Sequence, residues 1–177
     1  MRKKHHTYIM SGYGRFDMAK MQVEGLEEYA ELIQNISDDA EKIIKKSVYV
    51  GAGVIGDAIK NEIKKLPSDS TYGTEKDKAN VVTRLQKADL IDGFGISPIK
   101  DDGDYINAKV GWSGYGRIKT KRYPKGVPNQ MLARSVNSGT SFRQKNPFVT
   151  RAVNKNRKAA QKEMEKIIDE EIKKEMK

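Results

Sequence analysis

The stretch from Ile44 to Leu66 limits the possible folds most strongly, because its apolar side chains recur at the spacing of one helix face. The apolar positions are Ile44, Val48, Ile55, Ile59, Ile63 and Leu66. Ser37 can cap a helix here, Glu41 suits its first turn, and Pro67 cannot continue it. The pattern predicts a long amphipathic helix that must bury its apolar face against other elements.

A run of glycines inside this stretch allows a second interpretation. Residues Gly51–Gly56 satisfy the GxGxxG pattern and follow the apolar Val48–Val50, as a dinucleotide-binding turn follows its strand. That fingerprint also needs an acidic residue about twenty positions on, because the ribose hydroxyl needs an acceptor at the end of a second strand. The acidic residues from Asp69 to Asp77 lie in a polar stretch instead.

The phase of the apolar pattern favours a packing role for these glycines. The spacing continues from Val48 to Ile55 without a shift, so the glycines fall inside the predicted helix. Each glycine in a helix interior costs about 0.8 to 1 kcal/mol relative to alanine, which indicates close packing or a bend. We expect Gly51, Ala52 and Gly56 to let another backbone approach, and we keep a small nucleotide-binding enzyme as an alternative.

Shorter elements are predicted on both sides of the long helix. A strand near 20–24 and a helix near 25–35 precede it. A polar loop at 68–79 and a short helix at 81–91, closed by Gly93, follow it.

The centre of the chain predicts a small sheet. Two β-prone runs, Phe94–Ile99 and Tyr105–Trp112, are joined by a turn-rich stretch of hairpin length, which predicts an antiparallel pair. Residues 117–121 are expected to add a strand, and 122–126 to form a turn.

Two more helices are predicted in the C-terminal third. Pro128 suits the first position of a helix that ends near Gly139, and Asn146 with Pro147 suits the cap and first residue of a terminal helix. The apolar positions of the terminal helix are Val153, Ala160, Met164, Ile167, Ile168, Ile172 and Met176, and its favourable pairs are Asp169 with Lys173 and Glu170 with Lys174.

Together these elements predict an α+β fold. A small antiparallel sheet, made of a hairpin near 94–112 and one or two short strands, should pack against long amphipathic helices, including the second and the C-terminal one. Residues 1–17 are interpreted as an N-terminal extension and 18–177 as a single domain.

The composition argues against several classes of active site. The 177 residues include no cysteine, so disulfides, thiolate nucleophiles and cysteine-ligated zinc are excluded. The two histidines, His5 and His6, are neighbours in a basic tail and do not have the spacing of metal ligands. We therefore predict no catalytic, cofactor-binding or metal-binding residue. Without a membrane-spanning run or a signal peptide, the chain is expected to be soluble and not exported.

The charge of the chain is concentrated in one segment. No Asp or Glu occurs from Tyr105 to Gln161, whereas this segment holds thirteen of the 34 Lys and Arg residues and leaves 21 of them against 24 acidic residues elsewhere. Such segregation favours a polyanion or an acidic protein as partner, unless counter-charges lie nearby in space. Of the interleaved aromatic residues, Trp112 and Phe148 suit a core, whereas Tyr115 and Tyr123 suit either a core or a nucleic-acid contact.

Further positive charge lies in the first turns of the terminal helix. There the residues Arg151, Lys155, Arg157 and Lys158 oppose the sign that the helix dipole prefers. Local stability does not account for them, which suggests an external partner.

Two stretches of the C-terminal third resemble a known family. Residues 133–141 read ARSVNSGTS and residues 146–153 read NPFVTRAV. They resemble the phage tail-completion family typified by the gene-ten product of a lambdoid coliphage. Its members have an alanine-rich helix ending in a glutamate-glycine-threonine-serine phrase, then a proline-phenylalanine step into a long C-terminal helix. The stretches Val23–Glu28 and Asp92–Ile96 are also similar, whereas Ser138 replaces the usual glutamate.

This resemblance covers the chain from Met18 to its C-terminus and implies a structural role in a virion. The chain would complete the tail, or join head connector to tail tube, in the neck of a long-tailed phage, as a ring of identical copies around the DNA channel. Expected partners are copies of itself, the neck connector and tail-tube proteins, with non-specific contact to channel DNA and no membrane. The expected location is the virion neck or upper tail, and the host cytoplasm during assembly. No cofactor is expected.

Two loops are the candidate contact sites. The candidate assembly interface consists of Gly139, Thr140, Ser141, Phe142, Arg143, Pro147 and Phe148. The candidate contacts to channel DNA or a partner are Arg117, Lys119, Lys121, Arg122 and Lys125. The alternative function is a basic nucleic-acid-binding protein that acts through phosphate contacts.

Overall fold

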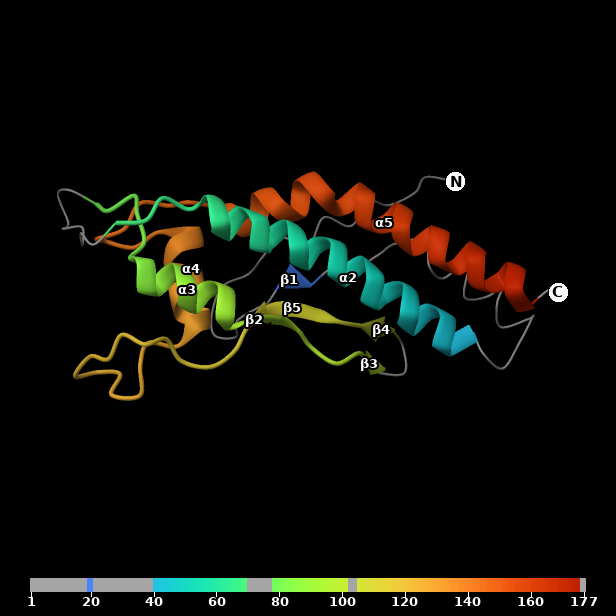
Figure 1. Cartoon of the computed structure of the whole chain (residues 1–177), viewed down its shortest axis with the longest axis horizontal. Helices are drawn as coiled ribbons and strands as arrows, with labels where there is room; N and C mark the ends of the chain where they lie inside the picture. Colours follow the sequence, from blue (N-terminus) through green and yellow to red (C-terminus); the bar gives the residue numbers. More distant parts are fainter. Residues whose placement is uncertain (1–18, 21–39, 70–77, 102–104, 176–177) are drawn as a thin grey trace, which may run out of the picture.

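Two long helices lie side by side along the longest dimension of the protein in a computed structural model (Figure 1). The structure describes residues 19–20, 40–69, 78–101 and 105–175. The predicted extension at 1–17, the helix near 25–35, the Ser37 cap and most of the loop at 68–79 lie outside the described residues.

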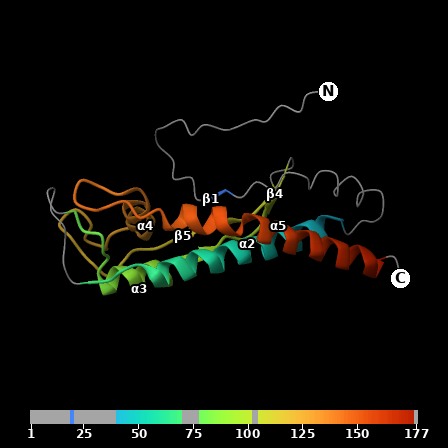
Figure 2. The ribbon, with the colours of Figure 1, turned by 90° about the horizontal axis from the view of Figure 1, so that it is seen from above.

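The helix predicted from the apolar stripe is α2 (Ala40–Lys65), and it packs against the terminal helix α5 (Phe148–Glu175). The two helices run antiparallel, because ion pairs join the C-terminal part of α2 to the first turns of α5 and the N-terminal part of α2 to the last turns of α5. At one end Glu62 Oε2 lies 3.1 Å from Arg151 Nε, and at the other Lys46 Nζ lies 2.9 Å from Glu171 Oε1. Figure 2 shows the pair from a second direction.

The core lies mainly between these helices and beneath α2. The side chains of Ile55, Ile59 and Ile63 on α2 are at most 2% exposed, and Ala160 and Met164 on α5 are similarly buried. The amphipathic pattern of both helices is therefore confirmed. Of the predicted partners in α5, Glu170 attracts Lys174, whose pKa is raised first by Glu171 and then by Glu170, but the ion pairs that form are Lys166 with Glu170 and Lys174 with Glu171.

The glycine run lies within the unbroken helix α2, as the phase of the pattern predicts. A Cβ added at Gly56 would lie 3.6 Å from Ile96 Cδ1 and 3.7 Å from Phe94 Cε1, which is ordinary van der Waals contact. At Gly53 it would meet nothing within 4 Å. The helical interpretation is confirmed, but the expected close approach of a backbone is wrong at Gly56, because side chains of the sheet lie there.

The sheet has the antiparallel character predicted. In the larger sheet β5 (Lys109–Trp112) lies between β1 (Ala19–Lys20) and β2 (Phe94–Ile96). The short strands β3 (Lys100–Asp101) and β4 (Ile106–Asn107) extend the β2–β5 hairpin as a separate pair. The α+β class and the hairpin are confirmed.

Two shorter helices complete the described part of the chain. Helix α3 (Arg84–Asp92) begins with a capping box, in which Thr83 and Gln86 each accept the other's backbone N–H. Helix α4 (Asn129–Ser138) starts one residue later than predicted, with Pro128 as its N-cap, and ends at Gly139, which has φ +78°. No helix among the described residues combines the length and apolar character needed to cross a membrane.

The strand predicted at 117–121 is wrong. Its backbone bonds to no described strand: Val127 N–H donates to the Ile118 carbonyl, Thr120 pairs with Tyr123, and Arg117 N–H donates to the Asp89 carboxylate. Because β1 and β2 already occupy both sides of β5, no free edge of this central strand is left for the segment. The turn predicted at 122–126 does form.

Candidate functional site

The candidate DNA or partner contacts lie on one loop between β5 and α4. We call residues Ser113–Pro128 the basic loop, and Figure 1 shows it extending away from the helices and the sheet at lower left. Four of the five candidates are exposed and form no ion pair with a described residue. These four are Lys119, Lys121, Arg122 and Lys125.

Backbone hydrogen bonds close the basic loop into a narrow hairpin. Thr120 and Tyr123 each donate an N–H to the other's carbonyl, at 3.1 and 3.0 Å, so Lys121 and Arg122 form the two-residue turn at the end of the loop. We call residues 118–125 the tip of the loop. Nearer the base, Gly116 N–H donates to the Val127 carbonyl at 2.8 Å. The geometry holds the tip cations at a fixed place on the chain.

The base of the loop is anchored on the buried Asp89 of α3. Asp89 is 5% exposed, and its Oδ2 accepts a hydrogen bond from the backbone N–H of Arg117 at 2.9 Å. Its Oδ1 forms an ion pair with Arg117 Nη1 at 3.1 Å. A second acid, Asp92, pairs with the other guanidinium nitrogen. Arg117 is therefore engaged within the chain, unlike the other four candidates.

Two glycines allow the strands of the loop to meet at its base. Gly126 has φ +109°, and a Cβ there would lie 1.9 Å from the Gly116 carbonyl oxygen. A Cβ at Gly116 would lie 2.6 Å from Asp89 Oδ2. Asn129, 4% exposed, donates from Nδ2 to the Ser113 carbonyl at 2.9 Å and fixes the start of the loop. Larger residues could not occupy these glycine positions without moving the loop.

The aromatic residues of the basic segment lie either in the core or at the surface. Phe148 is fully buried, and Trp112 packs edge-on between Phe94 and Phe148, with ring centroids 5.0 and 5.9 Å away. The core assignment of Trp112 and Phe148 is confirmed. Tyr115 is 61% exposed, and Tyr123 lies half-buried beneath the Arg122 guanidinium, 5.7 Å from its ring centroid.

The candidate assembly segment, residues 139–148, contains both surface and internal residues. Phe148 lies in the core, and Arg143, 6% exposed, donates to the Val81 carbonyl and to Gln86 Oε1. Both side chains are buried within the chain and are not available as surface contacts, which corrects that part of the expectation. Ser141 and Phe142 are exposed, and Gly139, Thr140 and Pro147 are half-buried. This segment also bonds to the chain at Ala79, whose N–H donates to the Phe142 carbonyl.

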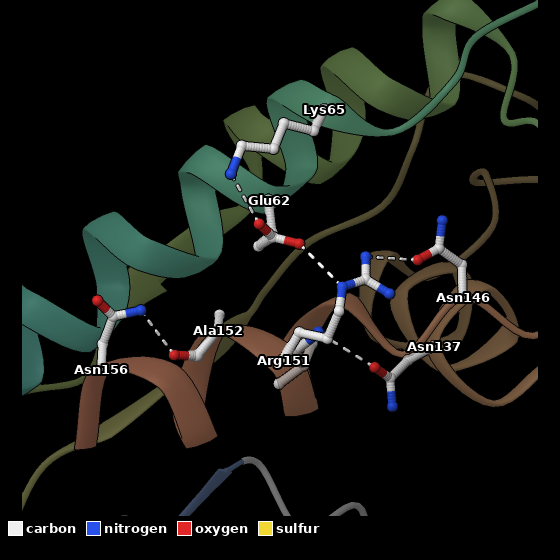
Figure 3. A network of polar contacts seen from close by, with 8 residues as sticks. Glu62, Lys65, Asn137, Asn146, Arg151, Ala152 and Asn156 are labelled. Carbon is white, nitrogen blue, oxygen red and sulfur yellow. Dashed lines mark hydrogen bonds and ion pairs between the residues drawn. The ribbon is translucent and has the colours of Figure 1, made fainter. Parts of the chain in front are cut away.

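The start of α5 carries a polar network that sequence patterns do not reveal (Figure 3). Arg151 pairs with Glu62 of α2 and donates from Nη2 to Asn146 Oδ1 at 2.8 Å. The carbonyl of Pro147 accepts the Arg151 N–H at 3.0 Å, while Asn137 Oδ1 of α4 accepts the Val149 N–H at 3.2 Å. The cap predicted at Asn146 is thus supplied from another helix. These contacts within the chain account for the positive charge of Arg151 at the start of α5, contrary to expectation.

The other three cations at the start of α5 remain exposed. Lys155, Arg157 and Lys158 form no ion pair with a described residue. They form a second group of surface cations, on a regular helix rather than on a projecting loop.

Ion pairs along α2 and α5 account for the displaced pKa values of described residues. The hydrogen bond from Lys65, followed by that from Arg151, lowers the pKa of Glu62 below its ordinary value. Lys174, followed by Lys46, lowers the pKa of Glu171 in the same way. Both shifts arise from ion pairs within and between α2 and α5.

The described residues offer little metal chemistry. No three His, Cys, Asp or Glu side chains in that part of the chain come together as a metal site requires. Its most distinctive surface feature is the projecting basic loop. Comparisons of the chain with protein-family models, with curated proteins and with solved structures found no match, so its function has to be inferred from its own residues and geometry.

Proposed function

We propose that this chain is a structural virion protein of the neck of a long-tailed phage. In this role it completes the tail or joins the head connector to the tail tube, as a ring of copies around the DNA channel. It works through interfaces and has no catalytic step. It acts in the virion and assembles in the host cytoplasm.

The observation that carries the proposal is the arrangement of the segment that resembles the tail-completion family. Helix α4 ends at Gly139, and the Pro147–Phe148 step opens the long helix α5. Phe148 is buried in the core, so this step fixes how α5 leaves the loop. This is the order of elements that the resemblance implies.

The unbroken helix α2 supports the same proposal indirectly. A phosphate cradle needs Gly51–Gly56 to turn between a strand and a helix, and here these residues are helical throughout. The motif that supported the alternative of a nucleotide-binding enzyme is therefore part of a helix.

Removal of the protein tests the proposal. In the phage that encodes it, deletion of the gene should leave filled heads and tails unjoined in negative-stain images, and supply of the protein in trans should restore joined, infectious particles. Joined particles that form without the protein would contradict the assignment.

A second candidate function is a stand-alone nucleic-acid-binding protein, and the exposed cations of the basic loop favour it. The two functions differ in their readouts. A stand-alone binder should leave particle assembly intact when deleted, whereas a neck protein is needed to join head and tail.

A further inference from the structure

We infer that the tip of the basic loop contacts the phosphate backbone of duplex DNA without selecting a base sequence, and that Arg117 positions this tip instead of contacting DNA. The inference rests on the loop alone. It holds for a neck protein that meets DNA in its channel and equally for a stand-alone binder.

The loop presents its charge at a fixed place. The two sides of the loop are joined by the Thr120–Tyr123 and Gly116–Val127 hydrogen bonds, and its base is held by the buried Asp89. Ordering a mobile loop on binding would cost conformational entropy, and a loop ordered in advance avoids most of that cost. The four exposed cations therefore meet a partner with little reorganisation.

The composition of the tip favours phosphate over an acidic protein surface. Three of its four exposed cations are lysines, at 119, 121 and 125. Lysine is depleted at protein interfaces, where aromatic side chains and arginine supply most contacts. The apolar side chains of the tip, Ile118 and Tyr123, are half-buried, and the exposed ring of Tyr115 lies at the base of the loop, so the tip has no large exposed apolar anchor. Phosphate groups need only positive charge and hydrogen-bond donors, which the tip supplies.

Arg117 has a different task from the other cations. Its backbone N–H and its guanidinium both bind Asp89, and its other nitrogen binds Asp92. Two acids already balance its charge, so it has little left to offer a phosphate. Its position at the base makes it a positioning residue for the tip.

Counterion release gives the size of the expected effect. Contacts from four cations predict that log K falls with log salt at a slope of about −3.6, because each phosphate contact contributes about −0.9. Affinity should then fall roughly a hundredfold between about 50 and 200 mM salt. Removal of two cations should bring the slope to about −1.8 and the loss to roughly tenfold.

The test measures the binding of a fluorescein-labelled DNA duplex of mixed sequence by anisotropy across a salt series, with the full chain. The tip variant is Lys121→Gln with Arg122→Gln. The matched control is Lys155→Gln with Arg157→Gln, which removes the same charges from the exposed face of α5. Circular dichroism checks that each variant folds. We expect the tip variant to halve the salt slope and the control to leave it unchanged. Arg117→Gln should leave the slope unchanged but weaken binding at each salt concentration, because the tip is then no longer held in place by Asp89 and Asp92.

Three results would overturn the inference. In the first, the chain does not bind the duplex at low salt. In the second, the tip variant and the control lose slope equally, which would mean that net charge alone drives binding. In the third, polyglutamate binds with the same dependence on the tip while the duplex does not, and the loop then docks on an acidic protein. A slope lowered by Arg117→Gln as much as by a single tip substitution would overturn the positioning role. None of these results depends on whether heads and tails join, so the neck proposal stands or falls separately.

Discussion

The glycines of α2 allow the helical interpretation to be tested directly by stability. Gly53→Ala should stabilise the protein by about 0.8 to 1 kcal/mol, which is the helix-propensity difference between the two residues. No further term is expected, because the new Cβ meets no atom within 4 Å. Gly56→Ala should gain the same propensity term and more, since its methyl group would contact Ile96 and Phe94 at ordinary distances. Burial of one methyl group adds about 0.8 kcal/mol.

The measurement is chemical denaturation followed by circular dichroism, with the free energy of unfolding extrapolated to water. For a chain of this size, 1 kcal/mol corresponds to a Tm shift of roughly 2 to 4 °C. Gly116→Ala is the control in the opposite direction, because its Cβ would lie 2.6 Å from Asp89 Oδ2. Gly116→Ala should destabilise the base of the loop.

The reasoning fails if Gly53→Ala and Gly56→Ala both lower the free energy of unfolding. In a phosphate-binding turn, glycines are required for backbone conformation or for close approach to a ligand, so alanine would be destabilising at both sites. If Gly53→Ala stabilises the protein and Gly56→Ala destabilises it, only the account of Gly56 is refuted, because a Cβ at Gly53 meets no other element within 4 Å.

Three further changes test the packing around α5. Phe148→Ala should cost about 3 to 5 kcal/mol because the ring is fully buried, and a midpoint of chemical denaturation close to that of the wild type would contradict this placement. Asn137→Ala should cost roughly 1 kcal/mol and raise hydrogen exchange at Val149, whose N–H it caps; unchanged exchange would show that another group supplies the cap. The pKa of Glu62 is lowered by folding, so its contribution is present above its ordinary pKa of about 4.3 and is lost as pH falls through the lower folded value. Glu62→Gln should therefore flatten the acid side of the stability profile, and an unchanged slope would mean that the ion pair with Arg151 is not maintained in solution.

Periodic features of the fold could be predicted from the sequence. The apolar stripe from Ile44 to Leu66 identified α2, and two β-prone runs joined by a turn-rich stretch identified the hairpin of β2 and β5. Both signals are local, because each residue of a helix or hairpin is patterned by neighbours close in the chain. Proline and glycine marked the ends of α4 and the start of α5 to within one or two residues for the same reason.

Contacts between distant parts of the chain could not be predicted. The partner of Arg151 is Glu62, which lies 89 positions earlier, and the cap of α5 comes from Asn137 on another helix. The strand expected at 117–121 failed for a similar reason. Its sequence is compatible with a strand, but β5 is already paired on both sides. Whether a segment becomes a strand depends on a free edge, which no local pattern records.

The segment from Tyr105 to Gln161, which contains no Asp or Glu, holds cations in two different environments. Three of its arginines bind other residues of the chain. Arg117 forms ion pairs with two acids, Arg143 donates to a carbonyl and an amide oxygen, and Arg151 forms an ion pair with Glu62. The planar guanidinium suits such sites because it donates several hydrogen bonds in fixed directions. The exposed Lys119, Lys121 and Lys125 form no ion pair with a described residue. A count of charges along the sequence treats both groups as one basic surface, whereas the structure separates cations that bond within the chain from cations that form no ion pair with a described residue.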